Sequence, residues 1–421
     1  MLAHDLPFIP LYESAPAETS ADDGVQDPSA RKRAARARGE SIRALLRAIG
    51  NDENREFQDR LGSLKPDLLI IQSSDFDMGL LLALLAYELR VKSVYFTDTL
   101  CRTEDRLVPP VRSPIIPGKR WPSLSVWFAW KKLRLRRRVG AIVSRLARIG
   151  YRSDLVRAGR QIAERCRYPW DLVESTDTLQ LRLPLAELVA WPLRLEFPAA
   201  ARPGSHYVGP LIDLDRKEPD FPWDRIDSRP LVYCALGTYK WRSAKAYVRF
   251  FRTIFDVAAT RPDLQWVVGL GDVVAPSEFA TIPANVVVVQ KAPQLSLLRR
   301  ATIAIAHGGA NTVIECAYFG VPMIVFPLGF DHHGYAARVV YHGFGLRGDF
   351  RKVDAVELGA LVDRVEKDSR IRSQARLLGA ELRAERSRAT ELVESLLDAR
   401  SSAVETDASL VDSEIRVSAA G

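Results

Sequence analysis

Residues 303–315 read IAIAHGGANTVIE, a run that predicts a buried strand turning directly into a helix. Its first four residues are apolar, as expected for a short strand that is covered on both faces of a parallel sheet. The two glycines after His307 let the backbone approach a ligand closely, and Asn311 and Thr312 stand where the helix begins. Free N–H groups at that helix start, together with the imidazole, predict a binding site for an anion.

A nucleotide diphosphate fits this pattern better than a simple anion does. Glu315 lies on the same helical face as Asn311 and Thr312, so its carboxylate can accept both hydroxyls of a ribose while the diphosphate stays at Gly309. Asp331 follows the next expected strand, at the edge where open α/β sheets bind ligands, and can accept sugar hydroxyls. Each feature alone is explained better by a turn, a helix cap or a solvated glutamate; it is their joint spacing that favours the nucleotide site.

The sequence around this run alternates regularly between strand and helix patterns, which predicts a Rossmann-like domain over residues 226–400. The expected strands are 231–236, 265–270, 286–290, 303–306 and 323–326, and the expected helices are 244–259, 295–299, 311–319, 335–341, 355–365 and 371–397. A preceding segment, 206–225, is rich in proline and is predicted to link this domain to the rest of the chain.

Residues 1–205 are predicted to form a second domain. A strand at 67–71, a helix at 78–89 and a strand at 92–97 repeat the same alternation and indicate another parallel sheet. Residues 14–39 lack apolar periodicity and are expected to be flexible, and the polar tail 401–421 is expected to be disordered.

Charge is concentrated in one segment of the chain. The net charge is +8, and residues 119–160 hold thirteen Lys or Arg against the single acid Asp154, with Trp121, Trp127 and Trp130 among them. The segment is predicted to be helical. It is either a solvated face or a helix that lies on an anionic membrane with its tryptophans at headgroup level. Nucleic acid is disfavoured because no recognition motif accompanies the charge.

Composition sets further limits. The four cysteines show neither metal-ligand nor disulfide spacing, and no apolar run reaches the roughly 18 to 20 residues that span a bilayer. The start of the chain does not have the pattern of a secretory signal. We therefore expect a cytoplasmic protein, peripheral on the inner membrane face if the basic segment binds lipid.

The run from Ala292-Pro293-Gln294 to Asp331 resembles the donor-binding signature of family-one UDP-glycosyltransferases, and the similarity extends from Tyr207 to Gly345. Within it, residues 336–345 are most similar to bacterial members that act on carotenoids or macrolides. The resemblance implies the GT-B fold, two Rossmann-like domains facing across a cleft. It also implies a UDP-sugar donor, an apolar hydroxylated acceptor and neither cofactor nor metal.

The resemblance assigns roles to positions of this sequence. It implies that Ala292 and Gln294 contact the base and ribose, and that His307 and Thr312 contact the phosphates. It further implies that Glu315 binds the ribose hydroxyls and that Asp331 and His332 bind the sugar. Thr238 faces the diphosphate, near Gly309 and Asn311. Two positions depart from the family pattern. Lys291 replaces an aromatic residue that stacks on uracil, and His332 replaces a common glutamine, so the resemblance leaves the base and the sugar open.

The family's catalytic histidine has no counterpart in the sequence before residue 67. Relatives open with a strand, a glycine-rich turn carrying that histidine, and a helix, whereas His4 lacks this context. We therefore expect an N-terminal domain without its first strand-helix unit. The orienting aspartate of the family is expected at Asp75, with Gln72 in the more literal position and Asp77 as a further alternative.

These observations predict an inverting hexosyltransferase. A protein that binds the nucleotide sugar without transfer is the alternative, because the catalytic histidine is absent. A sugar epimerase of the same architecture is supported by fold analogy alone.

Overall fold

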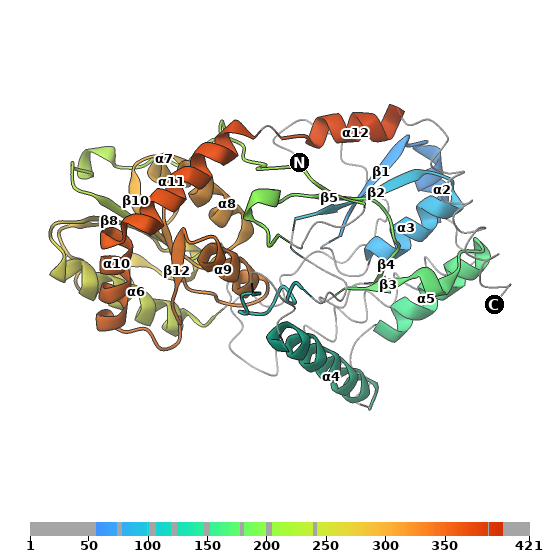
Figure 1. Ribbon diagram of the computed structural model, residues 1–421, viewed down its shortest axis with the longest axis horizontal. Helices are drawn as coiled ribbons and strands as arrows, with labels where there is room; N and C mark the ends of the chain where they lie inside the picture. The colour runs from blue at the N-terminus through green and yellow to red at the C-terminus, as the bar shows by residue number, and fades with distance from the viewer. Residues whose placement is uncertain are drawn as a thin grey trace.

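The computed structural model describes residues 56–73, 78–98, 100, 107–118, 124–146, 152–176, 181–198, 204–238, 242–385 and 387–398. They form two domains, each built around a parallel sheet, which lie side by side in Figure 1. Short 3-10 turns occur at Trp170–Leu172, Leu193–Leu195, Trp223–Arg225, Gly271–Val273 and Pro276–Glu278.

The N-terminal sheet has the order β1-β2-β5-β6, with every neighbouring pair parallel. Its strands are Leu68–Gln72 (β1), Lys92–Thr97 (β2), Glu187–Val189 (β5) and Ser205–Tyr207 (β6), and a separate antiparallel pair is formed by Glu174–Ser175 (β3) and Leu181–Arg182 (β4). The helices are Glu56–Ser63 (α2), Met78–Glu88 (α3), Leu124–Leu146 (α4) and Arg152–Arg165 (α5). Helix α3 is apolar on nearly all sides because it lies between the sheet and α5.

The C-terminal sheet has the order β12-β11-β10-β7-β8-β9 and is parallel throughout. Its strands are Leu231–Ala235 (β7), Gln265–Gly269 (β8), Val286–Val289 (β9), Ala301–Ala306 (β10), Met323–Val325 (β11) and Gly345–Arg347 (β12). The helices are Ala244–Thr260 (α6), Gln294–Leu298 (α7), Ala310–Phe319 (α8), His332–Tyr341 (α9), Ala355–Lys367 (α10) and Ser369–Ala384 (α11). The chain runs outward from the centre in both directions, so the strand order reverses between β7 and β10, as in the Rossmann fold.

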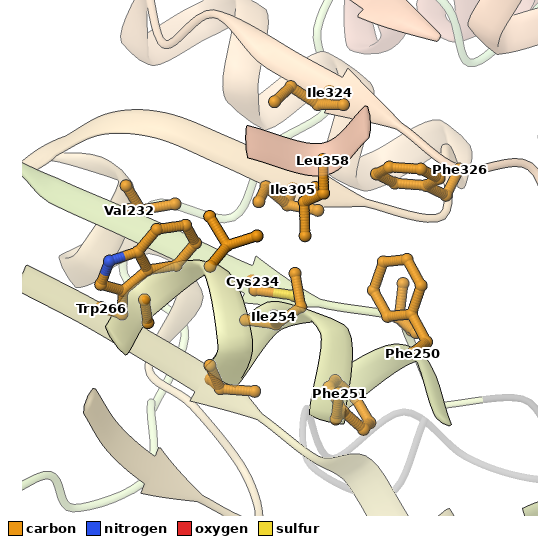
Figure 2. Packing of buried hydrophobic residues seen from close by; sticks show 14 of the residues in the cluster. Val232, Cys234, Phe250, Phe251, Ile254, Trp266, Ile305, Ile324, Phe326 and Leu358 are labelled. Atoms are coloured by element: carbon orange, nitrogen blue, oxygen red, sulfur yellow. The ribbon is translucent and has the colours of Figure 1, made fainter. Parts of the chain in front are cut away.

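Two layers of apolar side chains pack against this sheet, one on each face. On one face, α6 and α10 cover the strands, and Figure 2 shows Ile254 of α6 next to Cys234 of β7, with Phe250 of α6 facing Phe326. On the other face, α8, α9 and α11 bury a second cluster that includes Val325 of β11. The strands are apolar along their whole length because both faces are covered.

Helix α9 joins the two domains. The ring of Tyr335 lies 4.8 Å from that of Trp191, a residue of the N-terminal domain. At Gly334 the fit is so close that an added Cβ would lie 2.2 Å from the carbonyl oxygen of Val111. The domains are therefore packed against each other through α9 as tightly as a protein core.

The end of the chain differs from the sequence prediction. The single helix expected at 371–397 is two helices, α11 and Ala389–Asp398 (α12). Helix α12 crosses back to the N-terminal sheet, where Leu392 and Leu396 pack with Val94, and Lys92 Nζ donates to the Leu396 carbonyl at 3.2 Å. Residues 385–388, between the two helices, contain neither Gly nor Pro, so no residue there indicates from local sequence that the helix ends.

Other boundaries differ as well. The expected linker 206–225 begins inside β6, so its first residues belong to the N-terminal sheet. The C-terminal range 226–400 includes α12, which packs on the other domain. Strand β12 was not among the expected strands; it is short and contains Gly345.

The predicted basic helical segment, 119–160, contains α4 and the first nine residues of α5. Helix α4 lies at the edge of the molecule in Figure 1, and Trp130 anchors it by donating to the Val108 carbonyl at 3.0 Å. Within the ranges described above, we find no helix that is long and apolar enough to cross a membrane.

Candidate functional site

The predicted donor residues meet where the strand order of the C-terminal sheet reverses. The loop after β7 carries Gly237 and Thr238, and the loop after β10 carries His307. Strands β7 and β10 are parallel neighbours, so both loops leave the same edge of the sheet. Ligands of open α/β sheets bind at this position, in the crevice outside the carboxyl ends of the strands.

The imidazole of His307 is enclosed by glycine backbone. A Cβ added to Gly237 would lie 2.6 Å from Cε1 of the ring, and one added to Gly309 would lie 2.6 Å from Nε2. Gly308 has a φ of +87°, and a Cβ there would lie 2.6 Å from Val325. A side chain at any of these positions would displace the ring or its loop.

Burial keeps His307 neutral. Its side chain is 8% exposed, and desolvation lowers its pKa to about 4. Among the described residues its Nδ1 atom has no hydrogen-bond partner, although the atom is buried. This atom lies at the edge of the sheet where ligands bind. A buried polar atom without a partner is suited there to a ligand that supplies the missing hydrogen bond.

The start of α8 supplies backbone donors beside this ring. Gly309 is the N-cap, and the first backbone hydrogen bond of the helix runs from Val313 N–H to the Gly309 carbonyl. The N–H groups of residues 310–312 therefore precede the helical ladder and are available to an anion. Asn311 is exposed and Thr312 is half-buried at this end of the helix.

Glu315 lies at the centre of a polar network. It is 2% exposed, and Gln294 Nε2 donates to its Oε2 at 2.5 Å. Gln294 also donates to Thr312 Oγ1 at 3.5 Å and accepts from the Tyr233 hydroxyl at 3.1 Å. The predicted ribose and base residues are thus in contact with one another.

Arg216 and Glu218 were missed by the sequence reasoning, yet both belong to this network. Arg216 Nη1 donates to Glu315 Oε1 at 2.6 Å, and Nη2 donates to Oε2 at 3.3 Å. Glu218 accepts from the backbone N–H groups of Leu295 and Ser296 at 2.6 and 3.0 Å, which caps α7. Both residues lie in the proline-rich linker, which offers no local motif that would identify them.

Asp331 and His332 begin α9 next to His307. Asp331 is 7% exposed, and burial raises its pKa to about 6, with the nearby Asp98 adding to the rise and Arg112 opposing it. The ring of His332 lies 4.6 Å from that of His307 in an edge-on arrangement. Burial is the main cause that lowers the pKa of His332 to about 3, followed by repulsion from the His307 ring once that ring is protonated, and from His333 and Arg242.

The remaining predicted residues are placed as follows. Thr238 is exposed next to Gly237, and Ala292 is half-buried against Gly269, whose added Cβ would lie 3.4 Å from the Ala292 Cβ. Asp75 and Asp77 lie outside the described residues. Gln72, the last residue of β1, donates to Asp98 Oδ2 at 3.2 Å.

Metal ligands are not grouped in this site. Across the described part of the chain, His, Cys, Asp and Glu side chains form no cluster that could hold a metal ion. The donors at the site are instead an imidazole and helix N–H groups, which suit an anion.

Comparison with known proteins adds to this geometry. Residues 258–399 match the family model described as erythromycin biosynthesis protein CIII-like, C-terminal domain. The uncharacterized UDP-glucosyltransferase YojK of Bacillus subtilis (strain 168) is 34% identical over 150 residues, which are 35% of this chain and 36% of that protein. The zeaxanthin glucosyltransferase of Pantoea ananas is 31% identical over 168 residues, 39% of this chain and 38% of that protein.

Solved structures share the architecture. The glycotransferase of kitacinnamycin superposes with a TM-score of 0.61 at 23% identity, over 90% of this chain and 85% of that chain. CalG4, the calicheamicin glycosyltransferase, does so with a TM-score of 0.57 at 20% identity, over 90% and 83%.

Two parallel-sheet domains with these structural neighbours define a glycosyltransferase fold of the GT-B type, as the sequence predicted. The sequence matches add that residues 258–399 resemble the C-terminal domain of the CIII-like family, and that part of the chain is similar to named UDP-glucosyltransferases. The chain spans 36% and 38% of the lengths of the two curated relatives quoted above.

Proposed function

We propose that the chain transfers a hexose from a UDP-sugar to a hydroxyl group of an apolar small molecule, with inversion at the anomeric carbon. The carrying observation is the convergence of His307, the free N–H groups of α8 and Glu315 at the switch point of the C-terminal sheet. The names of relatives support a small-molecule acceptor, since they include a zeaxanthin glucosyltransferase and a demethyllactenocin mycarosyltransferase.

In the proposed reaction the acceptor oxygen attacks the anomeric carbon from the face opposite the diphosphate. The new C–O bond forms as the bond to the diphosphate oxygen breaks, and the acceptor proton passes to a base. His307 and the N–H groups of α8 stabilise the charge that develops on the leaving diphosphate, so we propose that no metal is needed. Asp331 and His332 face the sugar, and Asp75 stays a proposal as the carboxylate that orients the base.

A UDP-sugar is expected to slow hydrogen exchange in residues 307–315 with EDTA present throughout. His307→Ala and Glu315→Ala should each weaken UDP binding about tenfold or more, because each removes a polar partner from a water-poor site. Hydrogen-exchange mass spectrometry and calorimetric titration measure the two effects. Glu391→Ala, which removes an exposed carboxylate on α12, is the matched control and should bind as the unmodified chain does.

Unchanged exchange and unchanged affinity in both site variants would exclude the proposed nucleotide site. The alternative, a protein that binds the nucleotide sugar without transfer, makes the same binding prediction. Product formation with a panel of apolar alcohols separates the two, because transfer alone yields a glycoside.

We further propose that α4 lies on an anionic membrane surface, which suits an acceptor that partitions into lipid. Leu124, Phe128, Leu135 and Val139 are 75%, 60%, 63% and 52% exposed. At 3.6 residues per turn they fall within about 60° of one another, on the side opposite the buried Trp130.

Basic side chains flank this apolar stripe. Lys131 and Arg138 lie along one side and Lys132 and Arg136 along the other, all exposed, and Lys131 Nζ lies 3.9 Å from the ring centre of Trp127. An outward apolar stripe between rows of cations is the pattern of a helix that lies in the plane of an anionic bilayer. Charge complementarity therefore favours lipid over an apolar protein partner as the occupant.

Liposome flotation tests this proposal. The chain should float with vesicles that contain anionic lipid and stay at the bottom with neutral vesicles, because each cation near the surface contributes about 1 kcal/mol. Changing Lys131, Lys132 and Arg138 to Glu should abolish flotation. Changing Lys217, Lys352 and Arg376 to Glu alters the charge equally at other exposed sites and should leave it intact. Equal flotation of both triple variants would contradict the proposal.

A further inference from the structure

The carboxylate of Glu315 has little hydrogen-bonding capacity left. A carboxylate accepts about four hydrogen bonds, two on each oxygen. Oε2 accepts from Arg216 Nη2 and Gln294 Nε2, and Oε1 accepts from Arg216 Nη1. One acceptor position, on Oε1, therefore stays open.

The arrangement is held from several sides. Glu315 is 2% exposed, so displacing Arg216 would leave a buried carboxylate with neutral partners only. Two residues further along the linker, Glu218 fixes the backbone to the start of α7 through Leu295 and Ser296. Arg216 is therefore tethered to the helix that also supplies Gln294.

We propose that Glu315 accepts one ribose hydroxyl instead of two, and that Arg216 causes this by filling the other half of the carboxylate. The site then binds two kinds of nucleoside diphosphate equally well: ribonucleotides, and analogues whose sugar has only the one hydroxyl that reaches this carboxylate. This inference rests on the proposed nucleotide site, since it concerns how that site reads the ribose.

Calorimetric titration with UDP, 2′-deoxy-UDP and 3′-deoxy-UDP tests the inference on the intact chain. At least one deoxy analogue should bind within about twofold of UDP, because the hydroxyl it lacks has no partner on Glu315. The inference is overturned if both analogues bind about tenfold or more weakly than UDP. Absence of binding by all three would instead refute the proposed nucleotide site.

Variants at Arg216 test whether this residue causes the proposed selectivity. Arg216→Ala frees two acceptor positions, so both deoxy analogues should then bind about tenfold more weakly than UDP. Arg216→Lys donates at one position and should give an intermediate ratio. Lys217→Ala removes an exposed neighbouring cation and should keep the ratios of the unmodified chain. Ratios that do not change in Arg216→Ala would show that Arg216 does not set the selectivity. If Arg216→Ala fails to fold, the comparison of UDP with its two deoxy analogues in the unmodified chain still tests the inference.

Discussion

Replacing Glu196 by Ala is expected to lower the free energy of unfolding by about 3 to 5 kcal/mol. The two side chains of its ion pair with Arg338 are 0% and 2% exposed, and Nε and Nη2 of the arginine donate to Oε1 at 2.8 and 2.5 Å. Loss of the carboxylate leaves the guanidinium buried with the Gly334 carbonyl, at 3.1 Å, and the ring of Phe197. Because the pair joins α9 to the N-terminal domain, the interface between the domains should weaken with it.

Urea titration at pH 7 measures this loss, and a second ion pair across the domains provides the control. Arg194 donates to Glu381 through two nitrogens, but its side chain is 57% exposed, so Arg194→Ala should cost less than about 1 kcal/mol. Combining Glu196→Leu with Arg338→Met should recover most of the stability, since the cost comes from the unpaired charge. A Glu196→Ala variant within about 1 kcal/mol of the unmodified chain would contradict the expectation.

Local sequence was sufficient to predict the strand and the helix that carry the central residues of the candidate site. The expected strand 303–306 and helix 311–319 are the end of β10 and nearly all of α8. The signals are short-range: an apolar run for a strand buried on both faces, then glycines and small polar residues at a helix start. Glu315 follows from the same helix, so its position at the site needed no long-range information.

Contacts between distant residues were not predictable in this way. Arg216 and Glu315 are 99 positions apart, and only the path of the linker over the C-terminal domain brings them together. The charge of Asp98 acts on Asp331 because two domains pack, and the return of α12 to the N-terminal sheet is likewise a tertiary effect. The pattern of a single sequence indicates which face of an element is buried, but not what covers it.

The two buried histidines of the site should make the protein sensitive to acid. Burial lowers the pKa of His307 to about 4 and that of His332 to about 3, so both are neutral when folded. In the unfolded chain each takes up a proton near pH 6.5. Their contribution to stability is therefore fully present above about pH 6.5 and is lost as the pH falls toward the folded values, by about 2 kcal/mol for each imidazole at pH 5.

Asp331 acts in the opposite direction over part of this range. Its pKa is raised to about 6 by burial, so its contribution is present below the unfolded value near 4 and is lost as the pH rises through about 6. On going from pH 7 to pH 5, protonation of Asp331 offsets some of the loss at the histidines. Because two imidazoles oppose one carboxyl group, the net effect of these three groups is a fall in stability.

His332→Asn separates these contributions. The variant keeps a neutral polar side chain but has no imidazole to protonate, so its unfolding free energy should fall by about 2 kcal/mol less than that of the unmodified chain between pH 7 and pH 5. Asp331→Asn should fall more steeply than the unmodified chain, because the offsetting carboxyl group is gone. Urea titrations at pH 5, 6 and 7 measure the three slopes. If the unfolding free energy changes with pH in the same way in all three proteins, burial does not hold the imidazole of His332 neutral. The same burial argument at His307 would then fail.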